Sequence, residues 1–338
     1  MINAILIKDN FLENLRKIIS KSKFSKNDEI AIKVHMGEYG NITHVRPEIV
    51  GAVVEELKRM GTKPFLFDTP TLYKGSRDTP EKYLETARKN GFTEDTIGCP
   101  IIISDEGIKV KGKKYLKEIE VAKEIQNADG LVVISHFKGH PEAGFGGCIK
   151  NLGMGGATKK TKKIEHTESQ PIIIGDCKGC GTCVKFCKEG AIQIKNGKAV
   201  FDYDKCFGCG VCSEVCPNKV LKPREVSFRV LLAETATAIL EKFDKKKLLF
   251  INVLFDITER CDCFPIGGTG PGEIICPNIG IVVSDDIVAA DKASFDLVNK
   301  TVGKNIFDLI SHIKSEEQID AATKFGLGSK DYKLEVLE

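Results

Sequence analysis

The sequence predicts an α/β protein with a mostly parallel sheet and helices on both faces, interrupted by a small cysteine-rich module of α+β type. Three observations lead to this prediction. Short apolar runs alternate with segments of helical periodicity over the first part of the chain. The alternation stops at about residue 170 and resumes after Pro223. The 338 residues, 42% of them apolar, suffice for one large domain and a small one.

The first half of the chain supplies most of the expected sheet. Strands are predicted over residues 30–35, 64–68, 101–103 and 130–135, each of which is a short apolar run. Pro47 suits the first turn of a helix because that turn leaves its N–H groups unpaired, and Gly61 is expected to end this helix. A further helix is expected to begin at Thr79 and Pro80 and to close at Gly91.

The α/β pattern returns in the last third of the chain. Further elements are expected as a helix over residues 226–243, strands over 248–255 and 279–284, a helix capped by Ser284 that runs to about Lys300, and a helix over about 304–314 before a polar tail. We therefore predict that residues 1–170 and 224–338 form one discontinuous domain into which residues 171–223 are inserted. Three consecutive domains are the alternative, but the last ~110 residues hold few strands for a separate α/β domain.

Eight cysteines lie in two runs of the same spacing, C-x2-C-x2-C-x3-C. This spacing resembles that of bacterial ferredoxins, in which the fourth cysteine of each run binds the other of two [4Fe–4S] clusters. Cluster one is therefore assigned to Cys177, Cys180, Cys183 and Cys216, and cluster two to Cys206, Cys209, Cys212 and Cys187. Zinc knuckles or a disulfide framework are the alternative, but zinc sites usually leave no regular third and fourth cysteine. Between the runs, Asn196 and Gly197 predict the turn of a hairpin.

Composition argues against several classes of protein. The net charge of +3 gives no strong field for nucleic acid, and no run of 18 apolar residues predicts a membrane span. The N-terminus has acidic residues and no cleavage-like segment, so a secretory signal is not expected. Eight of the thirteen cysteines are assigned to clusters, which points to a reducing cytoplasm.

A second group of candidate residues lies in the glycine-rich segment 135–156, directly after a predicted strand. It contains His136, His140 and Lys150, and His166 follows in a basic segment that we expect to be a loop. Ligands of open α/β sheets bind at the carboxyl ends of strands, so these four residues are candidate catalytic residues. Lys150 is expected near a helix start, whose free N–H groups would favour a small anionic substrate. A glycine-rich packing loop with incidental basic residues is the alternative.

A third group, Cys261, Cys263 and Cys276, lies in a segment rich in glycine and proline. Three thiolates could bind zinc, copper(I) or an iron–sulfur centre, with water, histidine or Cys148 as the fourth ligand. Buried free cysteines are the alternative. Both this segment and segment 135–156 follow strands, so we expect Cys261 and Cys263 on the same side of the sheet as the glycine-rich segment. Nucleotide-binding fingerprints of the GxGxxG and Walker A types are absent from the sequence.

Two family resemblances rest on these residues. The chain resembles domain-of-unknown-function family three-six-two, which has a K-x-H…K-N-x-x-G block followed by an optional ferredoxin insert and a C-D-C segment. The residues that match the block are Lys138, His140, Lys150, Asn151 and Gly153. That family name implies no reaction.

A more distant resemblance is to the catalytic domain of nickel-pincer lactate racemase, through THVRP (43–47), HFKGHPEAGFGGCIK (136–150) and the later His166. It implies that Lys150, His136 and His166 line an active site and that Arg46 binds an anion. The gap inside the second block differs, and the racemase family has no ferredoxin module. We interpret this as shared ancestry of a pocket and not as nickel chemistry.

The sequence therefore favours an iron–sulfur oxidoreductase or reductive activator, which passes low-potential electrons from a redox partner protein to a site in the α/β domain. A ferredoxin-like carrier is the first alternative, but a simple carrier needs no pocket, and more than 200 residues surround the clusters. An iron–sulfur or metal assembly factor that holds a cluster for transfer is the second.

Overall fold

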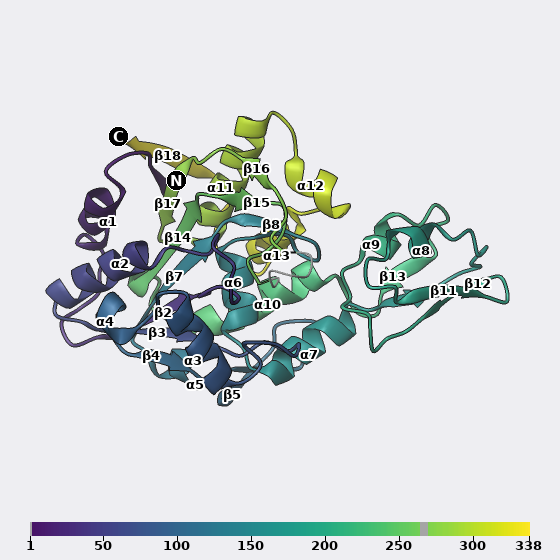
Figure 1. Ribbon diagram of the computed structural model, residues 1–338, viewed down its shortest axis with the longest axis horizontal. Helices are drawn as coiled ribbons and strands as arrows, with labels where there is room; N and C mark the ends of the chain where they lie inside the picture. The colour runs from purple at the N-terminus through teal and green to yellow at the C-terminus, as the bar shows by residue number, and fades with distance from the viewer. Residues whose placement is uncertain (1, 264–269) are drawn as a thin grey trace.

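An eight-stranded sheet forms the centre of the protein (Figure 1). The computed structural model describes residues 2–263 and 270–338. In sheet order the strands are β18 (Tyr332–Leu337), β1 (Ile2–Ile7), β17 (Gly280–Ser284), β14 (Leu248–Leu254), β7 (Gly130–His136), β2 (Glu29–Val34), β3 (Lys63–Asp68) and β4 (Ile101–Ile103). β14, β7, β2, β3 and β4 are parallel neighbours, whereas β17 is antiparallel to both β14 and β1. The predicted mostly parallel sheet is confirmed.

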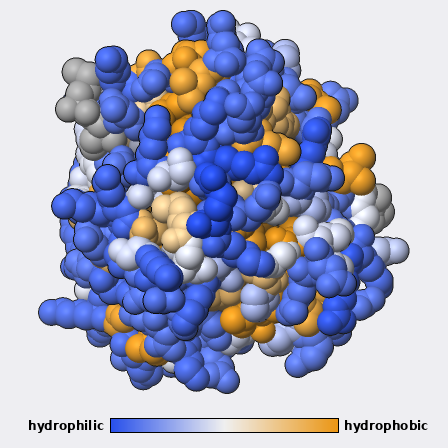
Figure 2. All heavy atoms as spheres, turned by 90° about the vertical axis from the view of Figure 1, so that its left-hand side faces the viewer, coloured by the Kyte–Doolittle hydropathy of each residue, from blue (hydrophilic) through white to orange (hydrophobic). Residues whose placement is uncertain are grey.

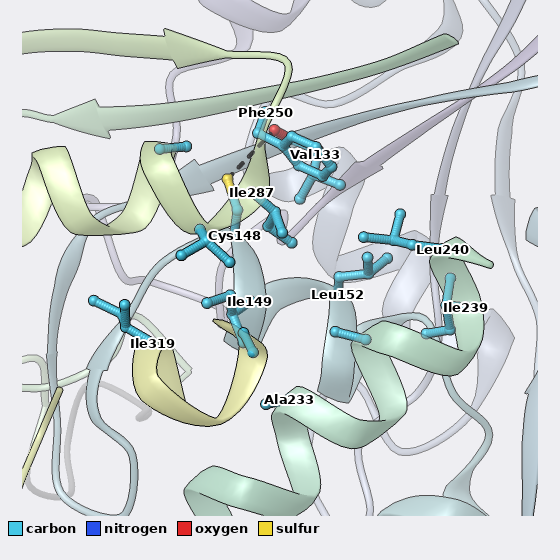
Figure 3. Close-up of a cluster of buried hydrophobic side chains, with 14 of the residues drawn as sticks. Val133, Cys148, Ile149, Leu152, Ala233, Ile239, Leu240, Phe250, Ile287 and Ile319 are labelled. Carbon is cyan, nitrogen blue, oxygen red and sulfur yellow. Dashed lines mark hydrogen bonds between the residues drawn. The ribbon is translucent and has the colours of Figure 1, made fainter. Parts of the chain in front are cut away.

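Helices cover both faces of the sheet, as predicted. One face packs against α1 (Phe11–Ile19), α2 (Pro47–Arg59) and α3 (Pro80–Lys89). The other packs against α6 (Cys148–Gly155), α10 (Phe228–Leu240), α11 (Ile287–Val302) and α13 (Glu317–Lys324). Within β7, Val132 and Ile134 face the first layer and Leu131 and Val133 the second, because side chains alternate along a strand. Figure 3 shows part of the second layer.

The local signals for helix ends mostly hold. Pro47 is the first residue of α2, and the Thr79 hydroxyl caps α3 by accepting from the Lys82 N–H at 3.3 Å. The cap of α11 was predicted wrongly. Ser284 ends β17 and accepts from the N–H of Asp286, whose own side chain caps the helix by accepting from Ala289 N–H at 2.9 Å.

Several elements were not predicted from the sequence. β1, α1, β18 and α13 flank the predicted core, and the basic segment expected to be a loop is the helix α7 (Lys159–Glu168). The tail is not irregular, because β18 pairs in parallel with β1 at the sheet edge and keeps a half-exposed, charged face there. The shorter helical elements are α4 (Glu94–Ile97), α5 (Lys123–Asn127), α12 (Ile306–Ser311) and the 3-10 turn Lys245–Lys247. Three antiparallel strand pairs lie outside the main sheet: β5 (Gly107–Lys111) with β6 (Glu118–Ala122), β8 (Lys138–His140) with β9 (Gly144–Gly146), and β15 (Ile257–Thr258) with β16 (Ile274–Cys276).

The cysteine-rich segment stands to one side of the sheet (Figure 1). Two antiparallel strands, β10 (Pro171–Ile173) and β13 (Leu221–Pro223), carry the chain out of the α/β body and back into it. Between them lie α8 (Thr182–Phe186), β11 (Ile192–Lys195), β12 (Lys198–Phe201) and α9 (Val211–Glu214). Asn196 and Gly197, with φ of 50° and 70°, make the predicted two-residue turn of the β11–β12 hairpin.

Among the described residues, none of the helices has the length and apolar character that crossing a bilayer requires. On the face beside α1, opposite the cysteine-rich segment, apolar side chains form small groups separated by hydrophilic ones (Figure 2).

Helix α6 packs closely on α10 at a glycine. A Cβ atom at Gly153 would lie 2.5 Å from the carbonyl oxygen of Leu232. Gly51, in the middle of α2, is a matched contrast, because a Cβ there would meet nothing closer than the Thr96 carbonyl at 3.5 Å. Both glycines are inside helices, so alanine gains the same helix propensity at either position.

We expect Gly153→Ala to lower the thermal unfolding midpoint, by a destabilisation of about 1–3 kcal/mol, because the added methyl group must push α6 and α10 apart. Gly51→Ala should keep or raise the midpoint, by up to about 1 kcal/mol of added stability. Circular dichroism in the far ultraviolet under anaerobic conditions measures both. Equal effects of the two substitutions would contradict close packing at Gly153.

Candidate functional site

The carboxyl ends of β2, β3 and β7 meet at one edge of the sheet, and a cavity lies there. Residues from the ends of β2 and β3, from the segments that follow β3 and β7, and from α6 and α7 form most of its wall. The cysteine-rich segment adds Glu189 and Phe207, and the C-D-C segment adds Cys263. Since open α/β sheets place ligands at this edge, the cavity is the candidate site.

A buried ion pair in the cavity wall links β2 to β3. Lys33 Nζ lies 3.0 Å from Asp68 Oδ1 and donates to Asn151 Oδ1 at 2.6 Å. The Tyr83 hydroxyl donates to Asp68 Oδ2 at 2.5 Å. Burial lowers the pKa of Lys33, and the nearby Asp68 carboxylate opposes that shift. Asn151 also donates to the Ile134 carbonyl at 2.9 Å, which ties α6 to β7.

Two further buried cations lie on the cavity wall. Arg77 donates to Glu38 at 3.0 Å and to the Tyr73 hydroxyl at 2.6 Å. Lys162 Nζ donates to Thr69 Oγ1 at 2.5 Å, and burial lowers the pKa of Lys162 to about 8. A lysine with this pKa can exchange a proton near neutral pH.

Backbone contacts fix the tautomer of His140, which lines the cavity. The N–H groups of Glu142 and Ala143 donate to its Nδ1 at 3.2 and 3.1 Å. An amide N–H only donates, so Nδ1 carries no hydrogen, and the neutral ring holds its hydrogen on Nε2. Burial lowers the pKa of His140 well below its usual value, and Lys150 and Lys138 add to the shift. His140 is therefore a neutral ring whose Nε2–H can donate.

His166 has the opposite tautomer. Its Nδ1 lies 2.8 Å from the Phe207 carbonyl, which only accepts, so Nδ1 carries the hydrogen and Nε2 is an acceptor. The ring stacks on Phe228 with centroids 4.7 Å apart. Burial lowers the pKa of His166 to about 4, although the bond to Phe207 opposes the shift. Its Nε2 could accept a proton or hold a metal, because a ligating histidine usually gives its other N–H to such an acceptor.

His136 lies behind the cavity wall and is not among the residues that line it. Its Nε2 lies 2.9 Å from the Phe255 carbonyl, and its Nδ1 lies 3.5 Å from Asp262 Oδ2. Lys138 Nζ pairs with Asp262 Oδ1 at 3.0 Å. Burial would raise the pKa of Asp262, but Lys138, His35 and His136 hold it well below its usual value. These contacts anchor the C-D-C segment beside the glycine-rich segment, on the side of the sheet that the sequence predicts.

Cys261 and Cys263 form a group with His140. One ligand atom from each residue lies within 4.8 Å of the other two, so the group could hold a metal ion. Lys150 Nζ lies 3.9 Å from Cys261 Sγ. Burial would raise the pKa of Cys261, but a hydrogen bond from Cys263 and the ammonium groups of Lys150 and Lys138 lower it. The hydrogen bond to Cys261 and burial raise the pKa of Cys263, so Cys261 is the first of the two to lose its proton.

The other two cysteines considered as metal ligands lie elsewhere. Cys276 ends β16, pairs with Ile257 and packs in the hydrophobic core, where burial raises its pKa to about 11. The third member of the group is therefore His140 and not Cys276, because a strand pairing holds Cys276 in the core. The Cys148 sulfur is turned towards the sheet, 3.8 Å from the Val133 carbonyl (Figure 3).

Two expectations about anion binding were wrong in detail. The amino end of α6 is not free, because its first two N–H groups donate to the carboxylate oxygens of Asp291 at 2.7 and 2.9 Å. Lys150 remains on the cavity wall, but these amides cannot assist it. Arg46 lies outside the cavity lining and pairs at the surface with Asp256 at 3.0 Å.

The two cysteine runs share one backbone form. Gly179 and Gly208 have φ of 60° and 70°, and Gly181 and Gly210 have φ of 77° and 83°, directly before α8 and α9. Glycine adopts such values most readily, which accounts for these residues between the cysteines. One hollow is lined by Cys177, Cys180, Cys183 and Cys216.

Cys187, the last cysteine of the first run, lies beside the second run. Burial raises the pKa of Cys206 and of Cys209, and the nearby Cys187 sulfur adds to both shifts. The hairpin supplies backbone donors to the sulfurs, since Ala191 N–H lies 3.3 Å from Cys187 Sγ and Ala199 N–H lies 3.4 Å from Cys177 Sγ. Cys216 thus lies with the first run, and Cys187 lies near the second.

The second run is held against α7 and α10. Arg229, buried at 2% exposure, donates to Glu317 at 2.7 Å and to the Cys209 carbonyl at 3.5 Å. Gln170 donates to the Cys206 carbonyl at 2.9 Å. At Gly208 a Cβ would lie 2.1 Å from the Ser169 hydroxyl, so the run and the end of α7 are in close contact.

The candidates that the sequence did not supply are Lys33, Asp68, Arg77, Lys162, Glu142 and Phe207. Two of them had a usable signal. Lys33 is a charged residue inside the apolar run 30–35, and Asp68 closes the apolar run 64–68. A charge at the end of a buried strand needs a partner, and at a sheet edge it is often part of a site.

Comparison with known proteins identifies the family and shows two distant structural likenesses. A family model described as "Domain of unknown function (DUF362)" matches residues 30–296, most of the chain. No curated protein matches. The lactate racemase apoprotein of Thermoanaerobacterium thermosaccharolyticum is similar with a TM-score of 0.38 and 14% identity, over 75% of this chain and 51% of that one. A protein of Thermotoga maritima, solved by a structural genomics consortium, is similar with a TM-score of 0.47 and 10% identity, over 86% of this chain and 58% of that one.

This chain therefore spans between half and three fifths of the length of these two proteins. The expected membership of the family is confirmed.

We expect Asp262→Asn to destabilise the α/β body by about 3–5 kcal/mol, because it leaves the buried ammonium of Lys138 without its carboxylate. Asp256→Asn is the matched control at the exposed Arg46 pair, and φ of 49° suits asparagine there. Asp256→Asn should lower the free energy of unfolding by less than about 1 kcal/mol. Denaturant unfolding followed by circular dichroism gives both values, and equal small costs would contradict a structural role for Asp262.

Proposed function

The chain belongs to the family described as a domain of unknown function, DUF362, and we propose that it is a two-cluster iron–sulfur protein that passes low-potential electrons to a substrate in the cavity of its α/β body. Its biochemical class would be an oxidoreductase or a reductive activator, working in a reducing compartment such as the cytoplasm. Residues 171–223 would form the ferredoxin-like domain, inserted into the α/β domain of residues 1–170 and 224–338.

One observation carries this proposal. Phe207 lies between Cys206 and Cys209, two proposed ligands of cluster two, and it also lines the cavity. Its carbonyl accepts the hydrogen bond from His166, a residue of α7 that also lines the cavity. A carrier that only docks partners has no use for a cavity at its cluster, so this contact favours a reaction at the site.

The cysteines present fit two [4Fe–4S] clusters. Cys177, Cys180, Cys183 and Cys216 would hold cluster one, and Cys206, Cys209, Cys212 and Cys187 cluster two. Backbone N–H groups that point at cysteine sulfurs, such as Ala191 and Ala199, are typical of cluster environments. When bound, the clusters would supply electrons one at a time at low potential.

The cavity residues would bind the substrate and move protons. Lys150 offers a positive charge for the carboxylate or phosphate of a small anionic substrate. His140 would donate a hydrogen bond from Nε2, and His166 would accept one at Nε2. His136 would act indirectly, because it holds the C-D-C segment in place from behind the wall.

The two cluster sites differ in exposure. Cys180 is exposed at the first site, whereas Cys206 and Cys209 adjoin the cavity wall at the second. Electrons would therefore enter at cluster one from a redox partner protein and leave from cluster two. Residues 174–222 carry eight lysines against five acidic residues, and Val184 and Ile194 are exposed beside the first run. This surface suits an acidic electron-carrier protein.

Anaerobic reconstitution should yield about eight irons per chain with the absorption and EPR signals of [4Fe–4S] clusters. Cys180→Ser should lose about half of this iron, since its sulfur is a proposed ligand of cluster one alone, and Cys99→Ala should lose none. Iron analysis measures this. Stoichiometric zinc with no iron would contradict the proposal.

Lys185→Glu should slow the reduction of the clusters by an acidic ferredoxin, because it reverses a charge on α8 beside Val184. The effect should fade at high salt, and dithionite, which needs no docking, should reduce the variant at the normal rate. Lys23→Glu, an exposed lysine of the α/β body, is the control. Stopped-flow absorption compares the rates, and equal slowing by both variants would argue against docking at the first run.

A further inference from the structure

We propose that Cys261 and Cys263 form a redox-active dithiol in the cavity, whose disulfide takes up the two electrons of the clusters and whose dithiol reduces a small anionic disulfide. This inference rests on the proposed function for its source of electrons. It assigns to the C-D-C segment a reaction and a substrate class.

The geometry suits a disulfide between these two residues. Their sulfur atoms lie within 4.8 Å of each other, and one residue separates them in sequence. To form a disulfide, the sulfurs must approach from this separation to about 2.05 Å. Cys276 and Cys148 are held in the core by strand pairing and by contacts with the sheet, so they do not compete for either sulfur.

The surroundings disfavour a metal ion at the same place. His140, the third member of the group, has its Nδ1 occupied by two amide donors, so in the neutral ring Nε2 bears hydrogen and has no free lone pair for a metal. Lys150 Nζ lies 3.9 Å from Cys261 Sγ. Lys138, paired with Asp262, brings a second ammonium group close by. Two cations beside the sulfurs repel a third and favour a thiolate.

The two sulfurs differ in access. Cys263 lines the cavity, whereas Cys261 is fully buried behind it. A substrate disulfide R–S–S–R′ would therefore meet Cys263, which would pass its proton to the Cys261 thiolate through the hydrogen bond between them and attack as a thiolate, releasing R–S⁻. Cys261 would then give this proton to R–S⁻ and attack the mixed disulfide, releasing R′–S⁻ and closing the Cys261–Cys263 bond. The cations Lys150 and Lys162 on the cavity wall favour a substrate that carries carboxylates.

The electrons and protons balance. Reduction of the Cys261–Cys263 disulfide takes two electrons and two protons and restores the two thiols. Two bound clusters that each gave one electron would supply the pair, and at low potential they would lie below most protein dithiols, which would favour transfer towards the disulfide. Lys162 lines the same cavity, and its pKa of about 8 lets it supply protons near neutral pH.

The test traps the thiols of the reconstituted, cluster-containing protein under anaerobic conditions. Oxidised glutathione serves as the small anionic disulfide, acid stops the reaction, and alkylation with peptide mass spectrometry follows. In the native chain we expect loss of both alkylation sites at Cys261 and Cys263 through one internal disulfide. In Cys261→Ser we expect glutathione on Cys263, and in Cys276→Ser the native result. Addition of dithionite should restore both alkylation sites when clusters are present.

Three outcomes would overturn the proposal. Both cysteines could remain alkylatable after oxidised glutathione. Glutathione could attach equally to Cys276 or Cys148. One metal beyond the cluster irons could be bound per chain and lost in Cys263→Ser, which would make the group a metal site. Iron content is measured separately, so failure of the dithiol with eight irons present leaves the proposed clusters standing, whereas absence of iron removes the electron source.

Discussion

The contact between the second cysteine run and the helices α7 and α10 is the constraint on which the site depends. Arg229 is buried there, and its Nη1 donates to the carbonyls of Cys209 and Glu142 while its Nε donates to the Glu317 carboxylate. A buried charge is tolerated only when its partners stay in place. If the run separated from the helices, the Arg229 guanidinium would lose some of its hydrogen-bond partners. Phe207 is therefore kept on the cavity wall, and the proposed cluster site stays beside the strand ends.

Charge pairing decides which cavity groups remain available for chemistry. Three cations form buried ion pairs: Lys33 with Asp68, Arg77 with Glu38, and Lys138 with Asp262. Lys150 is different, because the contact that the structure gives to its amine is to the Cys261 sulfur. The paired cations thus build the wall, and Lys150 is the cation best placed to meet a substrate or a thiolate.

Local patterns in the sequence predicted what local chemistry decides. The cysteine spacing gave the two runs, their glycines and the Asn196 turn, and short apolar runs gave the central strands. The sequence pattern could not predict which residue lies beside Cys261 and Cys263. Contact between β8 and β15 places His140 there, whereas strand pairing with Ile257 holds Cys276 elsewhere. The free N–H groups at the start of α6 were expected to bind an anionic ligand. They donate instead to the carboxylate of Asp291, which lies 143 residues after Cys148 in the chain. Long-range partners of this kind leave no mark at the positions they affect.

The two cavity histidines show how backbone groups set the direction of proton transfer. Amide N–H groups face Nδ1 of His140, and a carbonyl faces Nδ1 of His166, so the rings must take opposite tautomers. Burial lowers the pKa of both, and hence both are neutral at neutral pH. The cavity therefore has one fixed donor and one fixed acceptor, and neither depends on a side-chain partner that could rotate. A substrate in this cavity would therefore meet a hydrogen-bond donor at Nε2 of His140 and an acceptor at Nε2 of His166, the ring atom turned away from Phe207.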